Sequence, residues 1–288
     1  MPLRIVSLNS FMPGFQLVSS WAERHGHQLV LVVTTPIGTE RRYDATRAPF
    51  VLGLPPGTDS LVTGRLRSVA ARVIAALEPD LVISAAYPRL IPPEILDIPR
   101  YGALNLHPSA LPAGRGPNPF RLVYEGATTI GATLHRTARS FDSGPILSQV
   151  SGPLPDPLTP QTLFAAQDRL LGQALEQGTA AALSGEPGTP QDDTLATPAP
   201  AWTEADELLD MTEPGAIIRR KFAALNLLGS RARVLIDGTV VLLADLYAVP
   251  PTDPEHNAKP GTSLVSHPDG FTVQTADETL RLVVSRLV

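Results

Sequence analysis

The 288-residue chain has no cysteine, and only two of its 23 basic residues are lysines. Without cysteine there can be no disulfide, thiolate metal site or cysteine nucleophile, so any covalent or metal chemistry must use other side chains. The six histidines do not occur at metal-ligand spacings with carboxylates, and we expect no metal site. The chain also lacks an apolar run of about 20 residues and a basic, then apolar, secretory leader. We therefore expect a cytoplasmic protein.

The composition that is present is typical of a globular protein. Hydrophobic residues make up 43% of the chain and the formal net charge is −5, so the chain can bury at least one full core. The 30 prolines and 22 glycines follow no repeating period, which indicates loops rather than a fibrous repeat. The net negative charge argues against a nucleic-acid partner, because such affinity comes largely from Lys and Arg on phosphates.

The first 150 residues alternate apolar, strand-like runs with amphipathic stretches. This pattern predicts an α/β fold with a mostly parallel sheet covered by helices. Six strands are predicted, at residues 3–8, 28–34, 81–85, 103–107, 129–136 and 146–150. Helices are predicted at residues 15–24, 60–77 and 159–184.

Residues 187–200 contain four prolines and no apolar periodicity, which predicts a linker. Beyond it, a helix near residues 214–225 precedes short apolar runs separated by Asp-Gly and Pro-Gly turns. Such runs are typical of a small, OB-like β-barrel. We therefore predict an N-terminal domain at 1–186, a linker at 187–201 and a C-terminal domain at 202–288.

A polar cluster follows in residues 103–149. Asn105 and His107 alternate with apolar residues at the carboxyl end of a predicted strand, so their side chains should project to one face. Open α/β sheets bind ligands at that edge. Asp142 lies on a turn between two later strands. Taken singly, each residue has an ordinary structural interpretation as a turn or core residue, but their combination indicates a functional site.

In this segment the chain resembles the 10-formyltetrahydrofolate-dependent formyltransferases. That family's N-x-H, S-L-L-P-x-x-R-G-x-x-P, G-x-T-x-H/M and D-x-G-x-I/L motifs read here as residues 105–107, 109–119, 131–135 and 142–146. Residues 85–96 resemble the family's folate-pocket segment, and the tail from Trp202 resembles a shortened C-terminal barrel. The resemblance implies a Rossmann-like formyltransferase domain at 1–186, with 10-formyltetrahydrofolate as cosubstrate and no metal.

The resemblance also implies roles for individual residues. The catalytic triad would be Asn105, His107 and Asp142, in which the amide and a protonated imidazole stabilise an oxyanion and the carboxylate orients the imidazole or accepts a proton. The residues implied to bind folate are Leu90, Ile91, Ser109, Ala110, Leu111, Pro112 and Phe141. Those expected on the acceptor side are Asn9, Phe11, Tyr87, Arg115, Asn118 and His135, although His135 could equally be a core residue.

The prediction of the acceptor rests mainly on charge. In the resembled family, methionyl-tRNA formyltransferases carry a basic insertion after the second strand, whereas residues 35–49 here offer only Arg41, Arg42 and Arg47. The family's W-R-G-A-A-P is G-R-G-P-N-P at residues 114–119. Residues 204–288 hold eight Lys and Arg against twelve Asp and Glu, a net charge of −4, with residues 219–221 as the basic exception.

These departures favour a small-molecule amine as acceptor, such as a hydroxylated amino acid, an amino sugar or a natural-product intermediate. A methionyl-tRNA formyltransferase is the main alternative. A 10-formyltetrahydrofolate hydrolase and a non-catalytic folate-binding protein are further alternatives, and the intact triad argues against the last. The sequence predicts no membrane association and leaves the oligomeric state open.

Overall fold

The computed structural model describes residues 1–36, 50–250 and 258–285. Arg41, Arg42 and Arg47 therefore lie outside the described residues. Within these ranges, no helix is both long and apolar enough to cross a membrane. The chain divides into two compact units: one contains Met1–Pro117, Gly131–Gly152 and Gln167–Pro198, and the other contains Asn118–Ile130, Pro153–Ala166 and Ala199–Val288.

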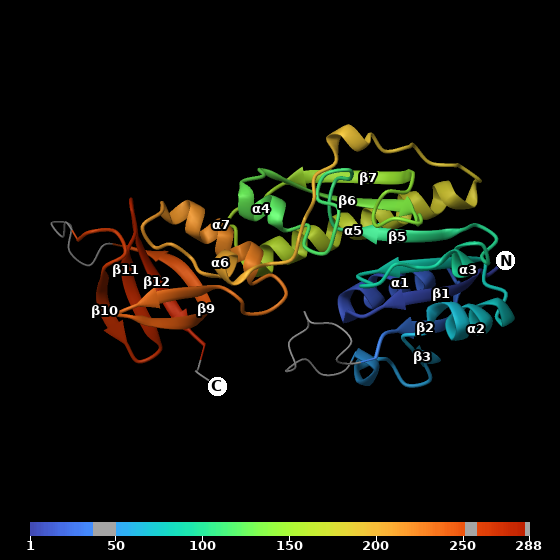
Figure 1. Cartoon of the computed structure of the whole chain (residues 1–288), viewed down its shortest axis with the longest axis horizontal. Helices are drawn as coiled ribbons and strands as arrows, with labels where there is room; N and C mark the ends of the chain where they lie inside the picture. The colour runs from blue at the N-terminus through green and yellow to red at the C-terminus, as the bar shows by residue number, and fades with distance from the viewer. Residues whose placement is uncertain (37–49, 251–257, 286–288) are drawn as a thin grey trace. The chain divides into compact units, whose positions relative to one another are not determined.

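The first unit is built on a seven-stranded sheet with the order β3-β2-β1-β4-β5-β6-β7 (Figure 1). Its strands are β1 (Arg4–Asn9), β2 (Gln28–Thr34), β3 (Ser60–Val62), β4 (Leu81–Ala85), β5 (Ala103–His107), β6 (Thr129–Arg136) and β7 (Ile146–Pro153). The pairings from β3 through β5 are parallel, and β6 runs antiparallel to β5. The predicted mostly parallel α/β sheet is thus confirmed.

The helices of this unit bury apolar side chains at helical spacing. Helix α1 (Met12–Arg24) buries Phe15, Val18, Trp21 and Ala22. The other helical segments are a 3₁₀ turn (Phe50–Gly53), a π-helical turn (Leu66–Ala70), α2 (Ala71–Ala76), α3 (Pro93–Leu96), a second 3₁₀ turn (Asp193–Leu195) and α5 (Pro160–Leu183), which belongs to this unit from Gln167 onward. Strand β4 is buried at every position, as expected of a central strand in a parallel sheet, whose two faces are covered by helices.

One predicted element is partly wrong. The sequence predicts a single helix over residues 60–77, but Ser60–Val62 forms the edge strand β3, which pairs in parallel with residues 32–34 of β2. Helical structure begins only at Leu66. Three residues are too few to show the alternation of a strand, and the helical spacing of the following residues masks them. The other predicted elements of residues 1–186 match the structure to within three residues.

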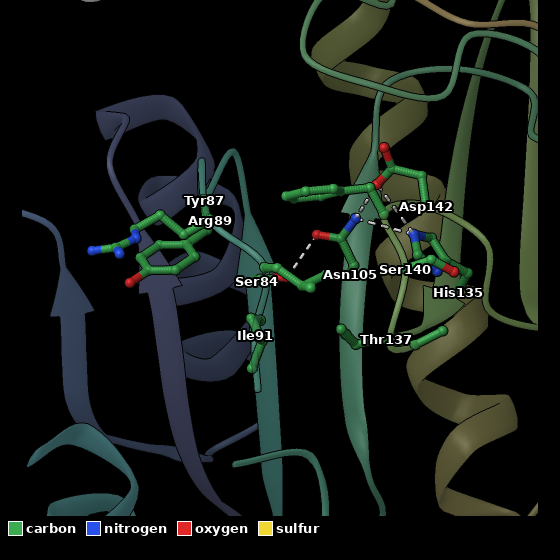
Figure 2. A pocket seen from close by; sticks show the side chains of 12 residues that line it. Ser84, Tyr87, Arg89, Ile91, Asn105, His135, Thr137, Ser140 and Asp142 are labelled. Carbon is green, nitrogen blue, oxygen red and sulfur yellow. Dashed lines mark hydrogen bonds and ion pairs between the residues drawn. The ribbon is translucent and has the colours of Figure 1, made fainter. Parts of the chain in front are cut away.

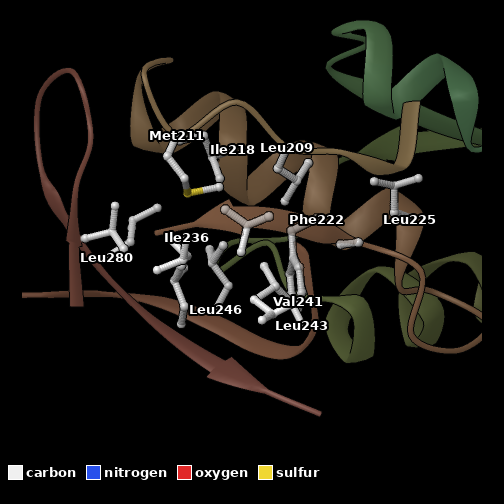
Figure 3. Close-up of a cluster of buried hydrophobic side chains, with 14 residues drawn as sticks. Leu209, Met211, Ile218, Phe222, Leu225, Ile236, Val241, Leu243, Leu246 and Leu280 are labelled. Atoms are coloured by element: carbon white, nitrogen blue, oxygen red, sulfur yellow. The ribbon is translucent and has the colours of Figure 1, made fainter. Parts of the chain in front are cut away.

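The second unit contains a five-stranded antiparallel sheet with the order β10-β11-β12-β9-β8. Its strands are β8 (Arg233–Ile236), β9 (Thr239–Val249), β10 (Ser263–His267), β11 (Gly270–Gln274) and β12 (Thr279–Val284); its helices include α4 (Arg121–Glu125), α6 (Glu204–Glu207) and α7 (Gly215–Leu225). Figure 3 shows its apolar core, where Ile218 and Phe222 of α7 belong to one buried cluster with Leu243 and Leu280. The C-terminal antiparallel sheet is as expected, and its closure into an OB-like barrel stays a prediction.

Helix α4 belongs to the second unit, although the sequence analysis assigns its residues to the first domain. The Tyr124 ring lies 5.3 Å from that of Trp202, measured between centroids. Arg121 forms an ion pair with Asp206 at 2.7 Å, and its guanidinium holds the pKa of that carboxyl well below the usual range. These partners are about 80 residues apart, so no local pattern predicts them. The division of the chain at residues 187–201 stays a prediction.

Two glycines on α5 test how closely this helix packs. A Cβ at Gly178 would lie 2.8 Å from Leu134 Cβ and 2.6 Å from Ser148 Oγ, whereas at Gly172 the nearest atom would be Leu17 Cδ2 at 3.9 Å. Alanine favours a helix over glycine by about 1 kcal/mol, but overpacking costs about 1–3 kcal/mol. We expect Gly178→Ala to lower the free energy of unfolding and its matched control Gly172→Ala to raise it, measured by urea denaturation. Equal effects would contradict this packing.

Candidate active site

Three polar side chains lie in one row across neighbouring strands. The parallel register of β4 and β5 sets Ser84 beside Asn105, and the antiparallel register of β5 and β6 sets Asn105 opposite His135. Figure 2 shows Asn105 between Ser84 on one side and His135 on the other. Because side chains alternate between the two faces of a sheet, a slip of one residue would turn a member of the row to the opposite face.

His135 is almost completely buried, with 1% of its side chain exposed. Burial above all, and then the positive charge of His107, lower the pKa of His135 to about 4. The ring is therefore neutral near pH 7. Its Nδ1 lies 2.8 Å from the Arg136 carbonyl oxygen, which can only accept, so Nδ1 carries the proton and Nε2 must be an acceptor.

This tautomer determines the orientation of the Asn105 amide. Asn105 Nδ2 lies 3.0 Å from His135 Nε2 and donates to Asp142 Oδ1 at 3.2 Å. The amide oxygen accepts a hydrogen bond from Ser84 Oγ at 2.6 Å. Both amide hydrogens and the carbonyl therefore have partners that fit a single orientation of the amide. One N–H points toward His135 Nε2 and the other toward the carboxylate of Asp142.

Asp142 lies on the loop between β6 and β7 with a φ of +52°, a left-handed conformation that costs a non-glycine residue about 1–2 kcal/mol. Its Oδ2 accepts from the Gly116 amide at 2.9 Å. Its Oδ1 lies 3.5 Å from His107 Nδ1, while His107 Nε2 lies 2.9 Å from the Gly114 carbonyl oxygen and donates to it. The carboxylate can thus orient the imidazole and share a proton with it.

The loop after β5 is held by hydrogen bonds to the neighbouring strands. Thr133 Oγ1 donates to the Ser109 carbonyl at 2.7 Å and accepts from the Leu111 amide at 3.2 Å. Gln149 Nε2 donates to the Leu111 carbonyl at 2.7 Å. The Leu111–Pro112 peptide bond is cis. The hydrogen bonds of Thr133 and Gln149 thus hold this loop against β6 and β7.

A small, open cleft lies beside the row (Figure 2). The predicted site residues that line it are Tyr87, Leu90, Ile91, Asn105, His135, Phe141 and Asp142. Sequence reasoning missed Ser84, Arg89, Thr137, Ala138 and Ser140, which also line it. The position of Ser84 at the end of a predicted strand could have revealed it. Thr137 Oγ1 is buried without a hydrogen-bond partner among the described residues, so a ligand could supply one.

Several predicted binding residues do not line the cleft. Ser109, Ala110, Leu111 and Pro112 form the loop after β5, where Ser109 Oγ donates to the Ala113 carbonyl at 2.6 Å. Their role in binding stays a prediction.

On the expected acceptor side, the side chain of Asn9 is buried and hydrogen-bonded to that of Ser7. Phe11 precedes α1 as its N-cap residue. Asn118 belongs to the second unit, where its Nδ2 donates to the Pro200 carbonyl at 2.9 Å. Acceptor binding by these residues stays a prediction.

The Arg115 guanidinium donates to Gln191 Oε1 from both Nε and Nη2, at 3.1 and 2.7 Å. It also forms a 2.7 Å ion pair with Asp193. These contacts occupy the side chain that the sequence analysis places at the acceptor entrance, and that role stays a prediction. Among the described residues there is no group of three His, Asp or Glu that could hold a metal ion.

Comparisons with known proteins identify one family. The family model described as "Formyl transferase" matches residues 5–176. A methionyl-tRNA formyltransferase of Pseudomonas syringae pv. syringae is 34% identical over 89% of this chain and 81% of its own length. The methionyl-tRNA formyltransferase of Roseiflexus sp. is 33% identical over 98% of this chain and 87% of its own length.

Solved structures share the fold. HypX from Aquifex aeolicus in complex with tetrahydrofolic acid matches 98% of this chain with a TM-score of 0.72 at 18% identity, and the match spans 44% of that longer chain. A sugar N-formyltransferase from Shewanella matches 83% of this chain and 95% of its own, with a TM-score of 0.61 at 16% identity.

The lowered pKa of His135 predicts a pH-dependent stability. Between the unfolded pKa near 6.5 and the folded pKa of about 4, the unfolded chain binds the proton and the native chain does not. The free energy of unfolding should therefore fall by up to about 1.4 kcal/mol per pH unit as the pH drops through this window.

The variant His135→Gln removes this titration. From urea denaturation at pH 6.5 and 5.0, we expect the wild type to lose about 2 kcal/mol more than the variant. Parallel losses in the two proteins would show that His135 does not resist protonation.

Proposed function

Because this chain belongs to the formyl transferase family, we propose that it transfers the formyl group of 10-formyltetrahydrofolate to the amine of a small-molecule acceptor. The observation that carries the proposal is the convergence of Asn105, His107 and Asp142 at the end of β5, beside the cleft. This group offers an amide donor, an imidazole and a carboxylate within one hydrogen-bonded network. It needs no nucleophile of its own, which fits a chain without cysteine.

In the proposed reaction the acceptor amine attacks the formyl carbon, and the formyl oxygen becomes an oxyanion. The N–H of Asn105 Nδ2 that makes the longer hydrogen bond, to Asp142, can donate to that oxygen instead. Preorganised donors aimed at a developing oxyanion typically contribute a factor of about 10²–10³ in rate. The bond between the formyl carbon and the folate N10 then breaks, so the formyl group leaves with the acceptor.

The same step requires a proton to leave the attacking amine and a proton to reach N10 as the carbon–N10 bond breaks. Asp142 can accept the amine proton, directly or through His107 Nδ1, which lies 3.5 Å from its Oδ1. The group protonated in this way can then give a proton to N10. His107 is buried, and a charge on it would act on the oxyanion more strongly than in water because water is excluded. Proton transfer by such positioned groups contributes about 10²–10⁴ in rate.

The cleft suits a flat, partly polar ring such as a pterin. Ile91 and Leu90 form an apolar wall, and Phe141, 55% exposed, adds a further apolar surface. Thr137 Oγ1 lacks a hydrogen-bond partner among the described residues, and a ring amide or amine could provide it. We therefore assign the cleft to the folate donor.

The charges of the second unit support a small acceptor. Besides Arg121, five of its cationic side chains are engaged with carboxylates, in the ion pairs Arg219–Glu278, Lys221–Glu213, Arg231–Glu207, Arg233–Glu207 and Arg281–Asp269. These pairs include two of the three residues in the basic run at 219–221. A polyanion such as tRNA would have to compete with those carboxylates, in a region whose net charge is already −4.

Methionyl-tRNA formylation is the second candidate. It is favoured by the curated relatives, which carry that name at 34% and 33% identity over most of the chain. The solved sugar N-formyltransferase is only 16% identical to this chain. It therefore supports a small acceptor only by the similarity of its fold.

A direct comparison of acceptors tests the proposal. The protein is incubated with 10-formyltetrahydrofolate and either charged initiator tRNA or a panel of amines that includes hydroxyornithine and amino-sugar nucleotides. We expect a formylated small amine and no formyl-methionyl-tRNA, because Arg219, Lys221, Arg231, Arg233 and Arg281 of the second unit already form ion pairs with its own carboxylates. Formylation of tRNA with a steep loss at higher salt would instead identify the tRNA as acceptor.

The substitution Asp142→Asn tests the proposed proton transfer. Asparagine has the same size and tolerates a positive φ, but it cannot accept the amine proton. We expect kcat to fall by about 10²–10⁴ while the affinity for tetrahydrofolate changes by no more than a few fold. The control Asp193→Asn, at an exposed carboxylate, should retain activity. A variant Asp142→Asn with wild-type kcat would remove Asp142 from the mechanism.

A further inference from the structure

The segment at residues 189–197, predicted from the sequence to be part of a linker, is bound to both loops of the candidate site. At one end, the backbone groups of Thr189 exchange two 2.8 Å hydrogen bonds with Ile146. At the other end, Thr197 accepts from the Arg115 amide at 2.9 Å through its carbonyl, and from the Gly114 amide at 2.9 Å through its Oγ1. We call residues 189–197 the strap.

Gln191 lies between these two ends, and its side-chain amide bridges the two loops. Its Oε1 accepts both hydrogen bonds from the Arg115 guanidinium. Its Nε2 donates to the carbonyl oxygens of Asp142 and Gly144, at 2.9 and 2.8 Å. Two donors and two acceptor sites are all that a glutamine amide offers, so every one is used.

The groups held by Gln191 are next to those that would act in catalysis. Arg115 lies between Gly114, whose carbonyl accepts from His107, and Gly116, whose amide donates to Asp142 Oδ2. Asp142 itself has a left-handed backbone, a conformation that persists only where neighbouring contacts hold it. A displacement of either loop would therefore change the distance between His107 and Asp142.

We propose that Gln191 is a positioning residue for formyl transfer, which holds the Arg115 loop and the Asp142 turn at the spacing that the reaction needs. This inference rests on the proposed function of the same site. Gln191 does not line the cleft, so its effect would come through Asp142 and His107. Small errors in the placement of reacting groups can cost about 10²-fold in rate.

The chemistry of the amide makes the test specific. Gln191→Glu keeps the length of the side chain and can still accept from Arg115, but it presents a carboxylate oxygen to the carbonyls of Asp142 and Gly144. The two hydrogen bonds to these carbonyls are lost, and the carboxylate repels the carbonyl oxygens. Asp193→Asn is the matched control, because it removes the other partner of Arg115, on the same strap, at a side chain that is 81% exposed.

The measurement is steady-state formyl transfer with the acceptor that the wild type uses, together with tetrahydrofolate binding. We expect Gln191→Glu to lower kcat by about 10- to 100-fold, with KM for both substrates and the tetrahydrofolate affinity within about threefold. We expect Asp193→Asn to keep kcat within twofold. If Gln191→Glu does not fold, Gln191→Met, which has a similar length and no charge, carries the same expectation.

A double-mutant cycle with Asp142→Asn distinguishes positioning from a general structural role. If Gln191 acts through Asp142, Gln191→Glu should cost less than threefold in the Asp142→Asn background, whereas an independent structural effect would multiply with that of Asp142→Asn. A wild-type kcat in Gln191→Glu, or a fully multiplicative effect, would overturn the inference. Absence of formyl transfer by the wild type would contradict the proposed function instead.

Discussion

The pairing register of β4, β5 and β6 is the constraint on which the candidate site depends. It brings Ser84, Asn105 and His135 into one row through backbone hydrogen bonds alone, before any of their side chains interact. Parallel pairing on one side of β5 and antiparallel pairing on the other make this row possible, because β6 returns along β5 and presents His135 at the level of Asn105. The side-chain bonds from Ser84 Oγ and to His135 Nε2 then hold the amide in one orientation. The relative placement of these three side chains is therefore built into the sheet.

The two histidines of the site lie close together and have different electrostatic tasks. Burial lowers the pKa of His135 and keeps it neutral, so it can serve as a hydrogen-bond acceptor for Asn105. His107 faces the carboxylate of Asp142, with 3.5 Å between Nδ1 and Oδ1. A charge on both rings at this spacing would be unfavourable. The neutral ring of His135 adds no positive charge beside this pair, and it holds the Asn105 amide with one N–H directed at Asp142.

Membership of the formyl transferase family and the charge of the second unit bear on different parts of the function. The family model covers residues 5–176, which contain the row, the carboxylate and the cleft, and therefore bears on the chemistry of the donor and of transfer. The acceptor depends on surfaces outside this core. In the second unit, Glu207, Glu213 and Glu278 engage Arg219, Lys221, Arg231 and Arg233, and a polyanion would have to compete with them. This internal pairing is what supports the proposed small acceptor.

The central strands can be predicted from the amino-acid sequence alone, because a strand buried on both faces is a continuous apolar run. The motifs at residues 105–107 and 142–146 can also be recognised there, because each lies within a few consecutive residues. The sequence could not show that Ser60–Val62 is a strand, since three residues carry no period, or that α4 packs with the second unit. Gln191 and Arg115 are 76 residues apart, and nothing in the proline-rich segment between the predicted domains indicates that it holds the site together. The orientation of the Asn105 amide and the bridge through Gln191 could not be predicted in this way. Both depend on hydrogen-bond partners that the folded chain brings together from distant parts of the sequence, and a one-dimensional pattern does not contain that information.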